Sequence, residues 1–122
     1  MSVARLRIVI ADDHALFRQG LRSLLQIQDD VEVVGEAERM DELLALLERC
    51  PCDLLLLDLG MERNSLVDIG ALAGRTTVVV VTASERLEDA IEAVRAGARA
   101  VVFKRFAVAS LMDAIRAAAQ GH

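Results

Sequence analysis

Five charged or hydroxyl side chains come directly after short apolar runs of the sequence. They are the acidic pair Asp12 and Asp13, the single Asp58, the hydroxyl of Thr82 and the amine of Lys104. Three carboxylates held close together repel one another and raise each other's pKa values, and a divalent cation with oxygen ligands removes that cost. A carboxylate can also attack a phosphoryl group, while a lysine and a hydroxyl hold the phosphoryl oxygens. These residue types therefore predict Mg²⁺-dependent phosphoryl chemistry, provided that the fold brings them together.

The segments that must position these side chains alternate between two patterns. Short aliphatic runs predict five strands, at 7–11, 31–36, 54–57, 78–81 and 100–103. Apolar residues at helical spacing predict helices at about 14–28, 40–47, 65–73, 87–94 and 108–119, the third of them short and weak. Gly97 is placed to close the fourth helix, and the polar residues within 31–36 are typical of an edge strand.

Five strand–helix units in 122 residues predict one α/β domain. The expected architecture is a doubly wound five-stranded parallel sheet of order 2-1-3-4-5, the flavodoxin-like fold. In such sheets ligands bind outside the carboxyl ends of the strands, where the strand order reverses. The first and third strands are neighbours there, so Asp12, Asp13 and Asp58 are expected to converge in one crevice.

The composition excludes several other classes of protein. Acidic residues outnumber basic ones by 19 to 14, and the basic residues are spread thinly, so the chain by itself is a poor candidate for binding nucleic acid. The longest apolar runs are far too short to span a bilayer, and the first three residues do not resemble a signal peptide, so a soluble cytoplasmic protein is expected. Cys50 and Cys52 are too few for a structural zinc site and are expected to be reduced and partly buried.

Several segments together resemble the receiver domain of bacterial two-component response regulators. They are Ile8-Val9-Ile10-Ala11-Asp12-Asp13-His14, Phe17-Arg18-Gln19-Gly20-Leu21, Val31-Glu32-Val33-Val34-Gly35-Glu36-Ala37, Thr82-Ala83, and Ala96-Gly97-Ala98-Arg99-Ala100 ahead of Lys104. The resemblance covers essentially the whole chain and is nearest to the NarL/FixJ branch, which is usually fused to a LuxR-type helix-turn-helix. No single motif is decisive, but the acidic pair, Asp58, Thr82 and Lys104 in this order are specific as a set.

The resemblance implies a role for each acidic residue. Asp58 would be the phosphoacceptor and would also bind a Mg²⁺ or Mn²⁺ ion. Asp13 would bind the metal directly, Asp12 partly through water, and the main-chain carbonyl of Gly60 would complete the metal shell. His14, next to the acidic pair, is expected to be a helix-start residue rather than a ligand.

The resemblance also implies partners and an output. Thr82 and Lys104 would contact the phosphoryl oxygens, and a sensor histidine kinase would donate the group. Residues 1–122 would be a receiver domain excised from a longer chain, with DNA bound only through a C-terminal helix-turn-helix domain. A second copy of the chain would be a further partner, in a homodimer. The output would be the regulation of transcription.

Four features depart from the family pattern. Receivers usually have a proline where Glu62 stands, and an aromatic residue where Val101 stands three positions before Lys104. Arg105 replaces a frequent proline, and the interval from Asp58 to Thr82 is shorter than usual, so a shortened third helix is expected. The departures leave the phosphorylation pocket intact, but they weaken the usual coupling between the pocket and the output.

Two alternative functions remain open at this point. A pseudo-receiver that acts as a dimerisation or interaction module without phosphorylation would explain Val101 and the changed segment after Asp58. A small Mg²⁺-dependent phosphohydrolase with Asp58 as nucleophile is less favoured, because Gly60 stands where an acid/base aspartate is needed and the chain has no segment for a cap.

Overall fold

The computed structural model describes residues 5–61 and 65–120 of the chain. Its centre is a parallel sheet of five strands in the order β2-β1-β3-β4-β5, so the predicted order 2-1-3-4-5 is confirmed. The strands are β1 (Leu6–Ala11), β2 (Val31–Ala37), β3 (Leu54–Asp58), β4 (Thr77–Thr82) and β5 (Ala100–Phe103). The helices are α1 (Ala15–Gln26), α2 (Met40–Arg49), α3 (Ser65–Ala73), α4 (Leu87–Ala96) and α5 (Ala107–Ala119), with a 3₁₀ turn η1 (Lys104–Phe106) before α5.

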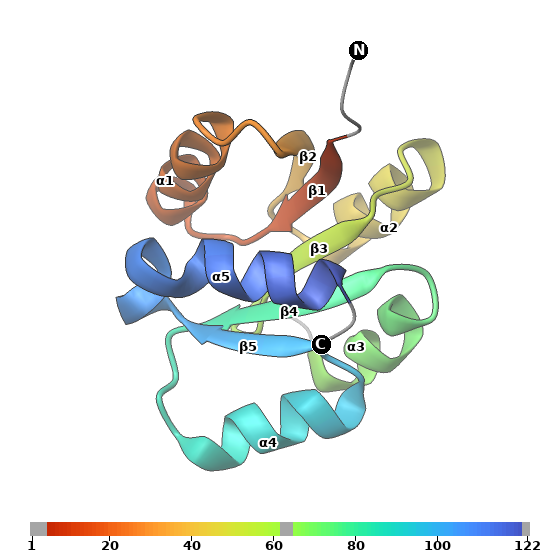
Figure 1. The fold of residues 1–122 in the computed structure, drawn as a ribbon. Helices are drawn as coiled ribbons and strands as arrows, with labels where there is room; N and C mark the ends of the chain where they lie inside the picture. The colour runs from red at the N-terminus through yellow and green to blue at the C-terminus, as the bar shows by residue number, and fades with distance from the viewer. Residues whose placement is uncertain (1–4, 62–64, 121–122) are drawn as a thin grey trace.

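Helices cover both faces of the sheet, and the alternation of side chains along β3 shows how. Leu54 and Leu56 belong to the apolar cluster that β3 shares with α1 and α5. Leu55 and Leu57 point the other way, into the cluster formed with α2 and α3. Figure 1 shows α5 lying across β4 and β5, with α2, α3 and α4 on the other side of the sheet. Because β3 is central, all its residues are buried, which is why this strand is apolar on both faces.

The structure extends two predicted strands by the residues that matter for chemistry. Asp58 is the last residue of β3 and pairs in register with Val81, while Thr82 ends β4 and pairs with Phe103. The third helix begins and ends at the predicted residues, and its 9 residues make it the shortest α-helix in the described part of the chain. Glu62, where receivers usually have a proline, lies outside the described residues.

The two cysteines, away from the carboxyl edge, match the sequence-based expectation. Cys50 and Cys52 are free thiols, partly buried between α2 and β3, and burial raises the pKa of Cys52. Among residues 5–61 and 65–120, none of the helices combines the length and the apolar character needed to cross a membrane.

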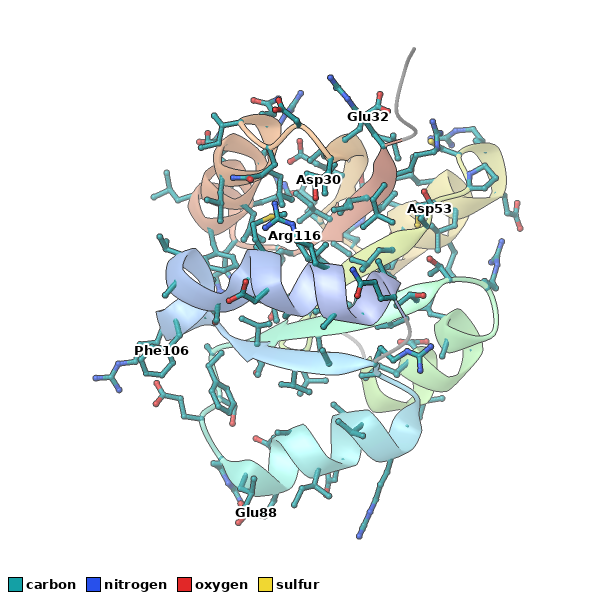
Figure 2. All side chains as sticks on the ribbon, viewed as in Figure 1. Asp30, Glu32, Asp53, Glu88, Phe106 and Arg116 are labelled. Carbon is teal, nitrogen blue, oxygen red and sulfur yellow. The ribbon has the colours of Figure 1, made fainter. Side chains whose placement is uncertain are left out.

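An ion pair on the surface connects α5 to the start of β2. Arg116 Nε donates to Asp30 Oδ2 at 3.0 Å, and Figure 2 shows the two side chains next to each other. The hydrogen bond from this guanidinium holds the pKa of Asp30 below its ordinary value. Both groups are open to solvent, so the pair adds little to the stability of the fold.

Gly97 closes α4, as the sequence predicts. Its φ of 128° lies in the region that side chains with a Cβ rarely adopt, and its N–H bonds to the carbonyl of Val94. A Cβ placed on Gly97 would come within 2.9 Å of the Cβ of Ala73 in α3. The glycine therefore allows both the turn into β5 and the close approach of α3 to α4.

We expect Gly97→Ala to lower the free energy of unfolding by more than about 1 kcal/mol, because it adds backbone strain and a contact with Ala73. Gly20→Ala is the matched control. Gly20 lies within α1 with no atom near the position of an added Cβ, so this change should raise stability by about 0.5–1 kcal/mol. Urea denaturation of both variants measures the two effects, and equal effects of the same sign would contradict this account of Gly97.

Candidate functional site

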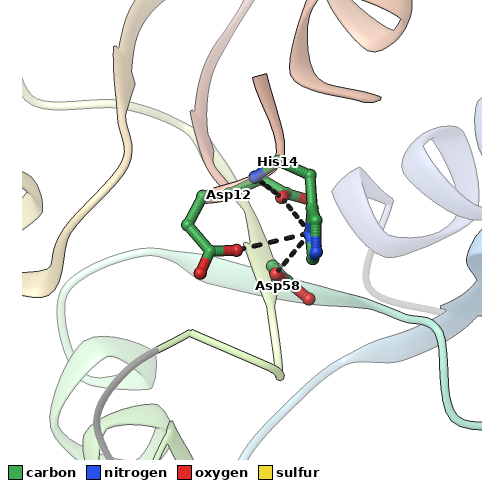
Figure 3. A group of neighbouring side chains, drawn as sticks. Asp12, His14 and Asp58 are labelled. Carbon is green, nitrogen blue, oxygen red and sulfur yellow. Dashed lines mark hydrogen bonds and ion pairs between the residues drawn. The ribbon is translucent and has the colours of Figure 1, made fainter. Parts of the chain in front are cut away.

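The carboxyl ends of β1 and β3 bring the three predicted carboxylates together. Asp12 follows β1, Asp58 ends β3, and these two strands are adjacent in the sheet. Ligand atoms of Asp12, Asp13, His14 and Asp58 all lie within 4.8 Å of one another. Figure 3 shows Asp12, His14 and Asp58 converging on one point. The predicted convergence of the acidic residues is confirmed.

Asp58 is the most constrained member of the cluster. Its side chain is 2% exposed. Oδ1 accepts the backbone N–H of Gly60 at 3.1 Å, whereas Oδ2 has no hydrogen-bond partner. Burial raises the pKa of Asp58, and the negative charges of Asp12 and Asp13 add to the rise, while the Gly60 N–H and Lys104 oppose it. This carboxylate keeps free lone pairs in a buried, negatively charged environment.

Asp12 is equally buried and is held by its own turn. Oδ1 accepts the backbone N–H of His14 at 2.7 Å, and Arg18 Nη1 donates to the Asp12 carbonyl at 2.6 Å. Oδ2 lies 2.9 Å from Lys104 Nζ, close enough for an ion pair, but the approach lacks the direction of a hydrogen bond. Asp12 therefore also has an oxygen without a hydrogen bond in the same pocket.

Lys104 brings one positive charge to the three carboxylates. It begins η1, directly after β5, and its side chain is largely buried. Nζ lies 3.6 Å from Asp58 Oδ1, in addition to its contact with Asp12. The ring of Phe17 in α1 lies 4.5 Å from the ammonium, which supports it by a cation–π contact. The predicted place of Lys104 beside the acidic residues is confirmed.

The structure places His14 at the helix start, as predicted, but also inside the cluster, which the sequence analysis did not anticipate. His14 is the N-cap residue of α1 with an extended backbone, and its side chain makes no capping hydrogen bond. Its Nδ1 lies 3.1 Å from Asp12 Oδ1, 3.3 Å from Asp13 Oδ1 and 3.6 Å from Asp58 Oδ2. The ring thus contacts every carboxylate of the pocket.

Thr82 and Gly60 lie near the pocket. The hydrogen bonds that they make do not test their predicted roles, which are contact with phosphoryl oxygens for Thr82 and metal binding for Gly60. The buried Thr82 hydroxyl accepts the backbone N–H of Ser84 at 3.0 Å, so its own proton remains free to donate. The N–H of Gly60 bonds to Asp58, while the expectation that its carbonyl binds metal stays a prediction. Val101, near the start of β5, lines an apolar surface groove with residues of α4.

Two supporting residues, Arg18 and Phe17, were assigned no role in the pocket from the sequence. Arg18 joins the end of β1 to β2, because it bonds both to the Asp12 carbonyl and to Glu36 Oε1, the latter at 3.1 Å. Phe17 was quoted only within a segment that resembles the family, and its ring also supports Lys104. Their place in the first turns of α1, next to the acidic pair, is the feature of the sequence that could have identified them as pocket residues.

The donor set fits a divalent cation. The described pocket offers carboxylate oxygens from three residues, and two of these oxygens are buried without a hydrogen bond. A buried carboxylate oxygen that lacks a hydrogen bond is costly, and hard oxygen donors of this kind are the usual ligands of Mg²⁺ and Mn²⁺. A bound cation would remove the repulsion that now falls on Asp58.

Fold and site together define a doubly wound α/β domain with an acidic pocket where the strand order reverses. The family model of the response regulator receiver domain matches residues 8–116. This chain belongs to that family, and its relatives place it in the NarL/LuxR-type branch.

Individual relatives agree with this assignment. The uncharacterized transcriptional regulatory protein YxjL of Bacillus subtilis is 35% identical over 99% of this chain and 57% of its own length. The nitrate/nitrite response regulator NarP of Escherichia coli is 36% identical over 94% of this chain and 55% of its own length. The signal receiver domain of a response regulator named NarL from Mycobacterium tuberculosis superposes with a TM-score of 0.90 at 27% identity, covering 98% of this chain and all of that one. The chain spans about half the length of the curated relatives it matches.

We expect Asp58→Asn to stabilise the protein in a buffer free of divalent cations at neutral pH, by on the order of 1 kcal/mol or roughly 4 °C in Tm. The amide removes a buried negative charge but can still accept the Gly60 N–H. Thermal unfolding followed by circular dichroism measures the change, with Asp29→Asn on the exposed surface as control.

The raised pKa of Asp58 determines at which pH the change Asp58→Asn stabilises the protein. Because folding raises the pKa of Asp58, the folded chain binds this proton more tightly than the unfolded chain does. The free energy of unfolding should therefore fall as the pH rises from the ordinary Asp value of 3.8 through the raised value. The variant should lack this decrease, so the two stability curves should separate above that range. If the stability curves of the wild type and the variant stay parallel over this pH range, the raised pKa assigned to Asp58 is contradicted.

Proposed function

We propose that this domain is a phosphorylation switch in which Asp58 accepts a phosphoryl group from a sensor histidine kinase. The single observation that carries the proposal is the pocket around Asp58. Its carboxylate has a free buried oxygen, lies 3.6 Å from the ammonium of Lys104, and shares the pocket with two further carboxylates. Nucleophile, positive charge and metal-binding oxygens are thus within one small volume.

Asp12, Asp13 and Asp58, with the carbonyl of Gly60, are proposed to hold a Mg²⁺ or Mn²⁺ ion. When bound, such an ion supplies positive charge that neutralises both the carboxylates and the phosphoryl oxygens. Arg18 would keep the Asp12 turn in place through its 2.6 Å bond to the carbonyl. The pocket would then admit the phosphoryl group without adding to the repulsion among its own carboxylates.

The transfer itself would be a displacement at phosphorus. A carboxylate oxygen of Asp58 forms the new bond to phosphorus, and the bond from phosphorus to the imidazole nitrogen of the kinase breaks. The departing nitrogen keeps the electron pair, and the product is an aspartyl-phosphate. Lys104 would exchange its contact with Asp12 for a phosphoryl oxygen, and Thr82 would donate its hydroxyl proton to another oxygen.

The proposed output is transcription regulation by a cytoplasmic protein. Relatives of the NarL type are roughly twice as long as the matched region, which suits a receiver that continues into a C-terminal DNA-binding domain. DNA would be bound only through that domain, and phosphorylation would act on it directly or through a homodimer. Val101 in place of an aromatic residue means that the signal must leave the pocket without the rotation of a ring.

The central test is phosphorylation of the purified domain. Incubation with Mg²⁺ and either acetyl phosphate or a cognate kinase should add one phosphoryl group, detected by intact-mass spectrometry. Asp58→Asn should abolish the adduct because an amide cannot serve as the nucleophile. Asp53→Asn, which changes an aspartate just before β3, is the control and should leave the adduct unchanged.

Two outcomes would contradict the proposal. The first is a wild-type protein without an adduct in either reaction. The second is an adduct that persists in Asp58→Asn, which would place the acceptor elsewhere. Regulation that survives in an Asp58→Ala version of the full-length regulator would instead favour a pseudo-receiver that acts without phosphorylation.

We also expect Asp13→Asn to weaken Mg²⁺ binding at least about tenfold, because it neutralises a proposed direct ligand, and changes even to supporting residues cost that much. Isothermal titration calorimetry measures the affinity, and Asp29→Asn again serves as an exposed control. An affinity equal to that of the wild type would remove Asp13 from the proposed metal site.

A further inference from the structure

We propose that His14 is a nitrogen ligand of the cation held by Asp12, Asp13 and Asp58, and that it shifts the preference of this site from Mg²⁺ toward Mn²⁺, Co²⁺ and Ni²⁺. The inference rests on the proposed metal site and goes beyond it, since it concerns which cation the pocket selects.

The position of the ring is the first argument. Nδ1 lies 3.1, 3.3 and 3.6 Å from one oxygen of each carboxylate in the pocket. Neighbouring ligands of an octahedral cation with bonds of about 2.1 Å are about 3 Å apart. The separations around Nδ1 are therefore close to those of ligands that share one ion, and small movements of side chains would complete the match.

The contact with Lys104 gives the second argument, because it shows that Nδ1 is the ring atom directed at the charged groups of the pocket. Nδ1 lies 3.0 Å from Lys104 Nζ, and an ammonium can only donate. Nδ1 accepts if Lys104 is its partner, whereas its 3.1 Å contact with Asp12 Oδ1 calls for a proton on Nδ1, because a carboxylate only accepts. In both cases Nδ1 is the ring atom that faces the pocket, and its lone pair is what a bound cation would use.

Local structure explains why the ring takes this position. The backbone N–H of His14 is bound to Asp12 Oδ1, and its extended conformation directs the side chain back toward the strand end. The ring caps no backbone group of α1, and its side chain is 62% exposed. It is consequently free to adjust, unlike the two buried aspartates.

The chemistry of the donor set leads to the selectivity. Mg²⁺ favours oxygen ligands, whereas imidazole suits transition metals, whose affinities rise from Mn²⁺ through Co²⁺ to Ni²⁺. Three carboxylates alone would bind each of these ions through oxygen. One added nitrogen should strengthen binding most for the ions late in that series and least for Mg²⁺.

The experiment compares cation affinities of the tag-free wild-type domain with those of His14→Ala and His14→Gln. Titration calorimetry at about pH 8 with Mg²⁺, Mn²⁺, Co²⁺ and Ni²⁺ gives the affinities directly, which is useful because the chain has no Trp or Tyr to report binding by fluorescence. The chain has two histidines, so His122→Gln is the matched control.

Both His14 variants should lose at least about tenfold in Ni²⁺ and Co²⁺ affinity and less than about threefold in Mg²⁺ affinity. His122→Gln should change neither. A second readout is electron spin-echo modulation of bound Mn²⁺, which should detect a histidine nitrogen in the wild type and lose it in His14→Ala.

Two results would overturn the inference. In one, the ratio of Ni²⁺ to Mg²⁺ affinity is the same in both His14 variants as in the wild type. In the other, the variants bind every cation more tightly, which would make the ring a counter-charge that the cation displaces. Asp58→Asn separates these failures from a failure of the proposed function. If that variant binds Mg²⁺ and Ni²⁺ as well as the wild type, the cation lies elsewhere and both proposals fail.

Discussion

The repulsion among three carboxylates at one buried edge of the sheet is the constraint on which the rest of this structure depends. Asp12 and Asp58 are almost completely buried, and each has an oxygen without a hydrogen bond. Lys104 supplies one positive charge beside three acidic groups, and burial, with the charges of Asp12 and Asp13 added, raises the pKa of Asp58. Such a pocket lowers the stability of the fold, and a cation bound beside the carboxylates would recover part of that stability.

The fold tolerates this loss of stability because the carboxylates are held by rigid elements. Asp58 ends a strand that is buried along its whole length between two apolar clusters. Asp12 is fixed by Arg18, which also bonds to β2, and Lys104 is held against the ring of Phe17. Helix α1 thus contributes more to the pocket than its apolar face suggests, because its first turns support both the acidic pair and the lysine.

His14 links the turn that follows β1 to side chains from distant parts of the chain. Its backbone belongs to the turn that presents the acidic pair, while its ring touches side chains from β3 and η1. An exposed, adjustable nitrogen beside buried, fixed oxygens is a means of choosing among cations without changing the carboxylates. Val101, by contrast, lies in β5 away from these contacts and lines an apolar groove with residues of α4.

Pattern alone was enough to predict the sheet order, the bounds of α3, the helix-closing role of Gly97 and the convergence of the acidic residues with Lys104. Those features follow from local periodicity and from the rule that parallel strands end at one edge, both of which can be read along the chain. The ring of His14, the reach of Arg18 across to Glu36 and the support of Lys104 by Phe17 came only with the tertiary structure. They depend on side-chain directions between segments far apart in sequence, and no periodicity of one segment records where the side chains of another will lie.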